Sequence, residues 1–124
     1  MLEQALLKAI APVLFKFGQA DRATSDIRIT EEYDLAEFSL IAKVILLPGH
    51  SRGSIGIHTA EGDLFAGDLF ESTQQPRLNS IMDDLAAAQA SVKKLKGLNV
   101  QTIYPGHGQP FALAQLMAAS SAAA

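Results

Sequence analysis

Two of the three histidines in the sequence directly follow a Pro-Gly pair. The letters PGH occur at 48–50 and again at 105–107, and the similar triplet AGD occurs at 66–68. Two imidazoles and a carboxylate suit Zn²⁺, Fe²⁺ or Mn²⁺ better than Ca²⁺ or Mg²⁺. Glycine before each side chain allows a positive φ or a close approach to a bound ion. We therefore predict a metal site made of His50, Asp68 and His107, provided that the fold brings them together.

A hydrophobic segment precedes each of these three residues. The segments are SLIAKVILLPG (39–49), LFAGD (64–68) and VQTIYPG (100–106), and each has the composition of a buried strand. We expect each strand to stop there and to place its polar residue in a tight turn. Strand ends gather at one edge of a sheet, so the three side chains can converge although they are far apart in the sequence.

The remaining patterns predict a mixed α/β or α+β chain. Residues 2–17 carry apolar side chains at helical spacing, which predicts either a buried core helix or a helix that packs against a second chain. Residues 26–30 alternate as a strand does, and 54–59 with 64–68 form a hairpin that turns at Gly62. Residues 70–79 are expected to be a loop. A helix then begins after Ser80 as its N-cap and ends near Gly97, and a short helix covers 110–119.

Composition excludes several classes of function. The 124 residues fit one domain, and a formal net charge of −3 without a basic run predicts no nucleic-acid partner. The absence of cysteine excludes disulfides and thiolate metal sites. No uninterrupted apolar run reaches the roughly 18 residues of a membrane span. The N-terminus lacks the basic start of a signal peptide, so we expect a cytoplasmic protein without a membrane partner.

The segments VILLPGHSRGSIGI, DLFAGDLF and TIYPGHG, in this order, resemble the later motifs of the metallo-β-lactamase superfamily of metal-dependent hydrolases. The resemblance implies half of an αββα sandwich, a mixed sheet with helices on one face. It also implies that His50 binds a first zinc ion (or iron or manganese), that Asp68 bridges two ions and that His107 binds the second. The implied reaction is hydrolysis of an ester, thioester, lactone or phosphodiester by a metal-activated water.

The sequence departs from that family in one important respect. It has no His-x-His-x-Asp-His motif, which carries four of the family's usual metal ligands. We therefore expect a truncated domain (1–124) with a partial metal site, weakly active or inactive alone, and we assign no catalytic residue. The inner face of half a sandwich would be bare, which predicts a homodimer or a partner chain that supplies the missing half. The alternatives are a non-catalytic homodimeric binding module and a gene fragment that retains the fold.

Several other polar residues have ordinary structural interpretations. His58 follows Ile57 in a predicted strand and is expected to be a surface or packed residue. Asp83 and Asp84 open a helix, where capping is the expected role. Arg77 could meet an anionic substrate, but an ordinary surface position is favoured.

Overall fold

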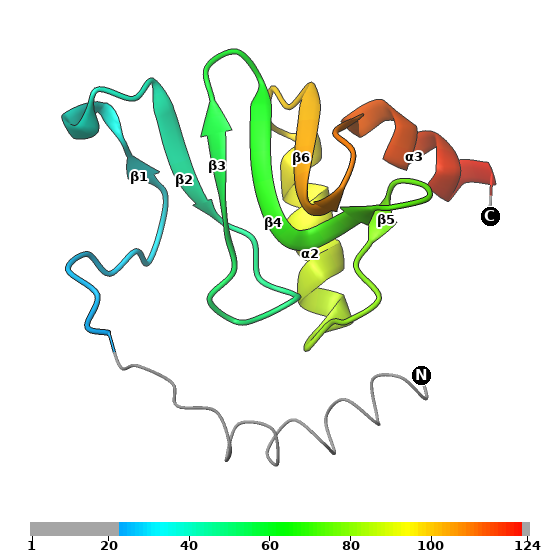
Figure 1. Cartoon of the computed structure of the whole chain (residues 1–124), viewed down its shortest axis with the longest axis horizontal. Helices are drawn as coiled ribbons and strands as arrows, with labels where there is room; N and C mark the ends of the chain where they lie inside the picture. Colours follow the sequence, from blue (N-terminus) through cyan, green and yellow to red (C-terminus); the bar gives the residue numbers. More distant parts are fainter. Residues whose placement is uncertain (1–22, 123–124) are drawn as a thin grey trace.

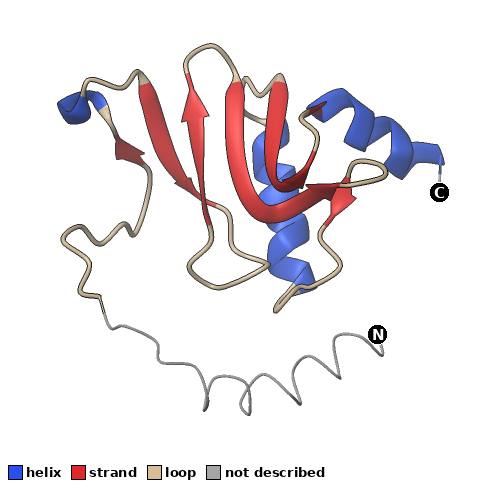
Figure 2. Cartoon of the chain, in the orientation of Figure 1, coloured by secondary structure: helices blue, strands red, loops and turns tan. Residues whose placement is uncertain are grey.

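The computed structural model describes residues 23–122, which form a curved sheet with helices beside it (Figures 1 and 2). The expected helix over 2–17, with its proposed place at a dimer interface, lies outside the described residues. The described elements follow one another in this order: β1 (Tyr33–Asp34), the 3₁₀ helix η1 (Ala36–Phe38), β2 (Ala42–Leu46), β3 (Ile55–Thr59), β4 (Asp63–Ser72), β5 (Arg77–Leu78), α2 (Leu85–Lys96), β6 (Thr102–Gly108), β7 (Phe111–Ala112) and α3 (Leu113–Ala122).

The sheet is mixed, as the sequence predicted. Its strands lie in the order β1-β2-β3-β4-β6-β7, and β5 pairs with β4 outside that path. All the pairings are antiparallel except β4 with β6, which is parallel. A parallel pair needs a crossover between its strands, and α2 provides it by passing behind the sheet (Figure 1).

The hydrophobic core lies between α2 and one face of the sheet. Successive strand residues point to opposite faces, so every second residue of β2, β4 and β6 faces the helix. Ala88 and Leu95 of α2 are fully buried against this face. The other core residues come mainly from the strands and the C-terminal segment: Ile45, Leu47, Leu64, Ala66, Leu69, Phe70, Met82, Ile103, Phe111, Leu113 and Leu116.

The opposite face of the same strands carries an exposed apolar surface, which we call the open face and define as Ile55, Ile57, Phe65 and Tyr104. Ile57 pairs with Phe65, and Phe65 pairs with Tyr104, so these side chains lie side by side. The rings of Phe65 and Tyr104 stack with their centroids 4.8 Å apart. Ile55, Ile57 and Phe65 are exposed. Among the described residues, no helix covers this surface (Figure 1).

Four predicted boundaries were wrong. The last helix, expected over 110–119, is α3 and begins at Leu113, because Phe111 and Ala112 form β7 and pair with β6. Residues 26–30 form no strand, because β1 begins only at Tyr33 and consists of two residues. The segment 70–79 is only partly a loop, since β4 continues to Ser72 and β5 pairs with it. The long helix begins at Leu85 instead of just after Ser80, because the Asp84 side chain accepts the hydrogen bond of the Ala87 N–H and caps it. Within residues 23–122, no helix has the length and apolar character needed to span a membrane.

Candidate metal centre

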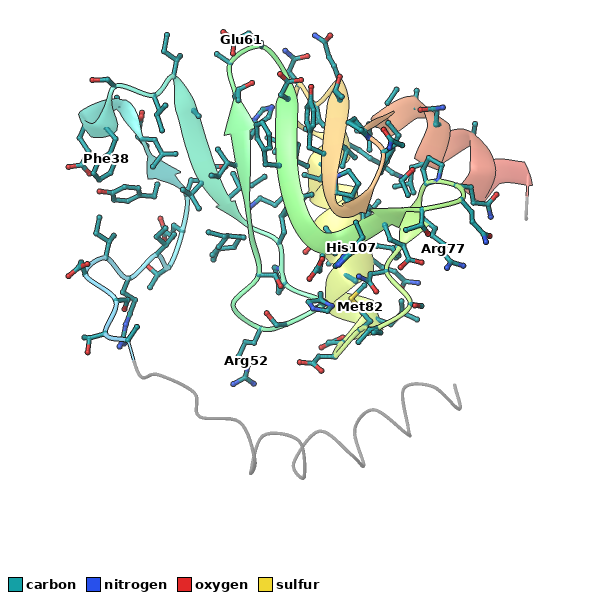
Figure 3. The ribbon with its side chains drawn as sticks, in the orientation of Figure 1. Phe38, Arg52, Glu61, Arg77, Met82 and His107 are labelled. Atoms are coloured by element: carbon teal, nitrogen blue, oxygen red, sulfur yellow. The ribbon has the colours of Figure 1, made fainter. Side chains whose placement is uncertain are left out.

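The structure brings His50, Asp68 and His107 together at one edge of the sheet. His50 Nε2 lies 3.7 Å from Asp68 Oδ2, and His107 Nδ1 lies 3.0 Å from Asp68 Oδ1. Each carboxylate oxygen therefore faces a different imidazole. The side chains are 30 % (His50), 37 % (Asp68) and 67 % (His107) exposed, so the cluster is open to solvent. Figure 3 shows His107 at this edge, next to the segment that contains Met82.

Only one of the three side chains lies in a turn after its strand, so the predicted placement was partly wrong. His50 follows β2, whereas Asp68 and His107 lie inside β4 and β6. The ladder between β4 and β6 is irregular here, with register shifts between Phe65 and Gly67 and again between Gly67 and Glu71. Gly67 has a φ of 53°, in the left-handed region that glycine adopts without strain. The regular pairing is interrupted at this point and resumes with Glu71 opposite His107, so Asp68 lies in the irregular part of the ladder.

The segment before α2 holds the loop that carries His50. His50 Nδ1 lies 2.7 Å from the carbonyl oxygen of Ile81. A carbonyl can only accept, so Nδ1 carries a proton, and in the neutral ring the lone pair is on Nε2, which faces Asp68. The backbone N–H groups of Asp83 and Asp84 both donate to the carbonyl of Gly49, each at 3.0 Å. The bonds to Gly49 hold the loop in place, and the contact with Ile81 orients the His50 ring.

A buried serine of α2 also forms a hydrogen bond to the loop that carries His50. The Ser91 hydroxyl donates to the carbonyl oxygen of Pro48 at 2.7 Å, and Ser91 is only 2 % exposed. Gly49 lies so close to the helix that an added Cβ would stand 2.5 Å from the Cβ of Ala88. Glycine at position 49 is therefore required by its close contact with α2.

The second Pro-Gly pair has a different reason. A Cβ on Gly106 would stand 2.2 Å from Asp68 Oδ1 and 3.1 Å from the Gly67 carbonyl carbon. Glycine at 106 therefore leaves room for the Asp68 carboxylate next to β6. The same carboxylate can then reach Nδ1 of His107.

The chemistry of these donors fits a metal ion of the zinc type, which binds imidazole nitrogen and carboxylate oxygen. A metal-binding histidine usually donates its other ring N–H to a carbonyl or a carboxylate, as His50 does to Ile81. Within residues 23–122, however, no group of three or more His, Cys, Asp or Glu side chains is arranged to hold an ion as it stands. The cluster therefore has suitable donors in an open, incomplete arrangement.

The other candidates have structural partners. His58 lies in β3, and its Nε2 is 3.0 Å from the carbonyl oxygen of Asn99. Because a carbonyl oxygen only accepts, His58 Nε2 is the donor. Arg77 pairs with Glu71 across β4 and β5. Asp84 caps α2, as its position before the helix predicted.

Sequence reasoning missed the residues that orient the cluster. Ile81 contributes a backbone carbonyl and Ser91 acts across 43 positions of the chain. Isoleucine and serine are common residue types, and neither by itself indicates such a role. Ser91 could have been noticed, because it occupies a helix position on the apolar side and a buried polar residue there needs a hydrogen-bond partner.

The comparisons with known proteins point to one family. The family model described as "Metallo-beta-lactamase superfamily" matches residues 5–107. The beta-lactamase-like protein 2 homolog of Drosophila melanogaster is 30 % identical over 106 residues, which are 77 % of this chain and 34 % of that protein. The homolog of Caenorhabditis elegans is 32 % identical over 83 residues, 64 % of this chain and 26 % of that protein. The chain thus spans about a third or less of the length of these relatives.

The fold agrees with solved structures. A metallo-beta-lactamase superfamily protein of the archaeon Sulfolobus tokodaii superposes with a TM-score of 0.61 at 17 % identity, over 98 % of this chain and 49 % of that one. TTHA1623, solved in a di-iron-bound form, superposes with a TM-score of 0.51 at 26 % identity, over 92 % of this chain and 56 % of that one. In both cases the chain matches about half of the larger protein.

Proposed function

The chain belongs to the metallo-beta-lactamase superfamily, and from this premise we propose that it is a metal-dependent hydrolase-type domain whose metal centre includes His50, Asp68 and His107. The observation that carries the proposal is the convergence of two imidazoles on the two oxygens of a single carboxylate. Zinc is the ion we propose, with iron or manganese as substitutes. The substrate would be an ester, a thioester, a lactone or a phosphodiester.

The chain's own residues have distinct parts in this proposal. His50 would bind through Nε2, because the carbonyl of Ile81 accepts the proton of Nδ1. Asp68 would offer one oxygen toward each histidine, and His107 would complete the set from β6. A bound ion would supply an activated water for hydrolysis.

We further propose that another polypeptide completes the site and covers the open face. The cluster supplies fewer donors than a closed tetrahedral site needs. Exposed apolar patches of this kind typically mark interfaces. A second copy of the chain is the occupant we put forward, because the solved relatives contain about twice the length that this chain matches. A different chain that supplies the other half is the other outcome of the test given in the Discussion.

Two specific observations favour a second candidate function, a non-catalytic binding module. The cluster within the described residues is not arranged to hold an ion as it stands. Asp68 also already pairs with His107, which satisfies part of the cluster without metal. In this alternative the fold and its open face persist as an interaction surface while hydrolysis is lost.

Hydrolysis assays on zinc-loaded protein separate the two candidates. Chromogenic substrates of the four classes are incubated with wild-type protein, with Asp68→Asn and with Glu61→Gln, which changes an exposed hairpin carboxylate (Figure 3). Slow turnover that is lost in Asp68→Asn and on chelation, but kept in Glu61→Gln, supports the hydrolase. Bound zinc without turnover in any class supports the binding module instead.

A further inference from the structure

Asn79 directly follows β5 and connects the strand that carries Asp68 with the segment that contacts His50. Its backbone N–H donates to the carbonyl oxygen of Leu69, the residue after Asp68, at 3.1 Å. Its side-chain Oδ1 accepts the N–H of Ile81 at 2.9 Å. Asn79 therefore joins the two sides of the cluster, although it is not one of the candidate ligands.

These contacts close a ring of residues around the cluster. From Asp68 the ring passes through the adjacent Leu69 to Asn79. It continues from Asn79 to Ile81, whose carbonyl oxygen lies 2.7 Å from His50 Nδ1. It closes where His50 Nε2 lies 3.7 Å from Asp68 Oδ2. Leu69 and Ile81 take part only through their backbones, so the amide of Asn79 is the only side chain in the ring besides the two candidate ligands.

Hydrogen bonds hold the Ile81 backbone where its own side chain does not. Ile81 is 47 % exposed, so burial in the core does not hold this residue. On its C-terminal side the chain is held by Met82, which is buried (Figure 3). On its N-terminal side the Ile81 N–H donates to Asn79. Loss of the Asn79 acceptor would therefore free one side of the residue whose carbonyl contacts His50.

Two acceptors compete for the proton of the neutral His50 ring. The Ile81 carbonyl oxygen, 2.7 Å from Nδ1, favours the form with the proton on Nδ1. The Asp68 carboxylate, 3.7 Å from Nε2, favours the form with the proton on Nε2, because its negative charge attracts an N–H group. Only the first form leaves the lone pair on Nε2, where a metal ion between His50 and Asp68 would need it.

We propose that Asn79 is a positioning residue, which keeps the lone pair of neutral His50 on Nε2 by holding the Ile81 carbonyl at Nδ1. Its value for metal binding rests on the proposed function, whereas the state of the ring can be measured without metal. Groups that orient a metal-binding histidine typically contribute about 10- to 100-fold to metal affinity. Asn79 makes that contribution through the backbone of Ile81.

The state of the His50 ring in the metal-free protein is the most direct test. Long-range proton–nitrogen NMR spectra at about pH 8, where an ordinary imidazole is neutral, show which ring nitrogen carries the proton. His58 is an internal reference, because its Nε2 donates to the Asn99 carbonyl. We expect the wild type to carry the proton on Nδ1 of His50 and on Nε2 of His58. A wild-type His50 with its proton on Nε2 would overturn the proposal before any variant is made.

Substitution of Asn79 then tests its part. Asn79→Ala removes the acceptor and should shift the His50 proton toward Nε2 without changing His58, and zinc affinity in a calorimetric titration should fall about tenfold. Asn79→Asp keeps a side-chain oxygen that can accept the Ile81 N–H, so it should restore both the ring state and the affinity. Gln74→Ala, which changes an exposed amide in the turn between β4 and β5, is the matched control and should behave as the wild type does.

The variants can overturn the proposal in three ways. The first is an unchanged His50 ring in Asn79→Ala, and the second is an Asn79→Asp variant that behaves as Asn79→Ala does. The third is a loss of zinc affinity without a change at His50, because a merely structural role would lower affinity without moving the ring proton. If the His50 ring shifts as expected but the wild type binds no zinc, the part of Asn79 is supported and the metal centre is overturned, so the two claims fail separately.

Discussion

At the scale of single residues, the cluster depends on small side chains as much as on its ligands. Gly106 leaves the space that the Asp68 carboxylate occupies. Asp68 in turn is the residue that both histidines face. The glycines of the two Pro-Gly pairs are therefore packing requirements, Gly49 against α2 and Gly106 against Asp68.

Gly106→Ala is predicted to weaken metal binding without unfolding the chain. The new Cβ would stand 2.2 Å from Asp68 Oδ1, and the carboxylate, at the end of a flexible side chain, can rotate away. Its bond to His107 would then be lost, and we expect zinc affinity to fall roughly tenfold, as it does when other orienting groups are removed. Calorimetric titration with zinc measures the change.

Gly53→Ala is the matched control, since a Cβ at residue 53 would meet nothing within 4 Å. It should leave both zinc affinity and thermal stability unchanged. If Gly106→Ala binds zinc as well as this control does, Asp68 does not take part in the site.

At the scale of elements, α2 does more than cover the sheet. The residues just before it, Ile81, Asp83 and Asp84, hold the His50 loop. Ser91, within the helix, donates to the carbonyl of Pro48 in the same loop. Because the start of the helix and the position of His50 are joined in this way, changes at the N-terminus of α2 should affect both stability and the cluster.

Asp84→Ala is predicted to destabilise the chain by about 1 kcal/mol, the usual cost of removing an N-cap. The Asp84 carboxylate accepts from the Ala87 N–H at 2.9 Å, and alanine cannot replace that bond. Denaturant unfolding followed by circular dichroism gives the value.

The neighbouring Asp83→Ala serves as the control, because Asp83 contributes its backbone N–H to Gly49 and alanine retains that group. It loses only a charge near the helix start, which is worth a few tenths of a kcal/mol. Equal losses for the two variants would contradict the assignment of Asp84 as the cap.

The sequence predicted which segments form strands and helices better than it predicted the residues at which they begin and end. The hairpin at Gly62, the strand before His50 and the helix before β6 were all found, because their periodicity and turn residues are local signals. The boundary at Ser80 failed, since Ser80 and Asp84 both precede an apolar run. In the structure Asp84 is the cap, and its backbone N–H also donates to Gly49, a partner that is distant in the sequence.

The candidate site was predicted in its members but not in its geometry. The residue types of His50, Asp68 and His107 were sufficient to nominate them. That two of these lie within strands follows from the bend at Gly67 and the renewed pairing of Glu71 with His107, which are non-local. The Ile81 carbonyl is a backbone group and leaves no mark in the sequence.

At the scale of the whole molecule, the sheet within residues 23–122 has one side packed against helices and one apolar side that no described helix covers. Burial of apolar surface is worth about 25 cal/mol per Å², so the open face favours association. The chain also matches only about half of the solved structures with this fold. A second polypeptide of similar length over the open face would bring the assembly to about the size of those solved structures.

Association through the open face predicts a dimer that Ile57→Asp separates into monomers. Ile57 lies at the centre of the face, where a buried unpaired carboxylate would be costly. Light scattering after size-exclusion chromatography measures the mass of each variant.

Ile41→Asp is the matched control, because Ile41 is also an exposed isoleucine but lies outside the open face and outside the metal cluster. It should leave the dimer intact. A wild-type chain that stays monomeric and well folded at high concentration would contradict the second copy as the occupant.

The most direct test of the central claim is a metal analysis of protein purified without added metal and then titrated with zinc. The account predicts about one zinc ion per chain in the wild type, lost in His50→Ala and in His107→Ala. His58→Ala, which changes the one remaining histidine, should bind as the wild type does. Folded protein that takes up no zinc, or that binds it equally in all three variants, would contradict a metal centre at His50, Asp68 and His107.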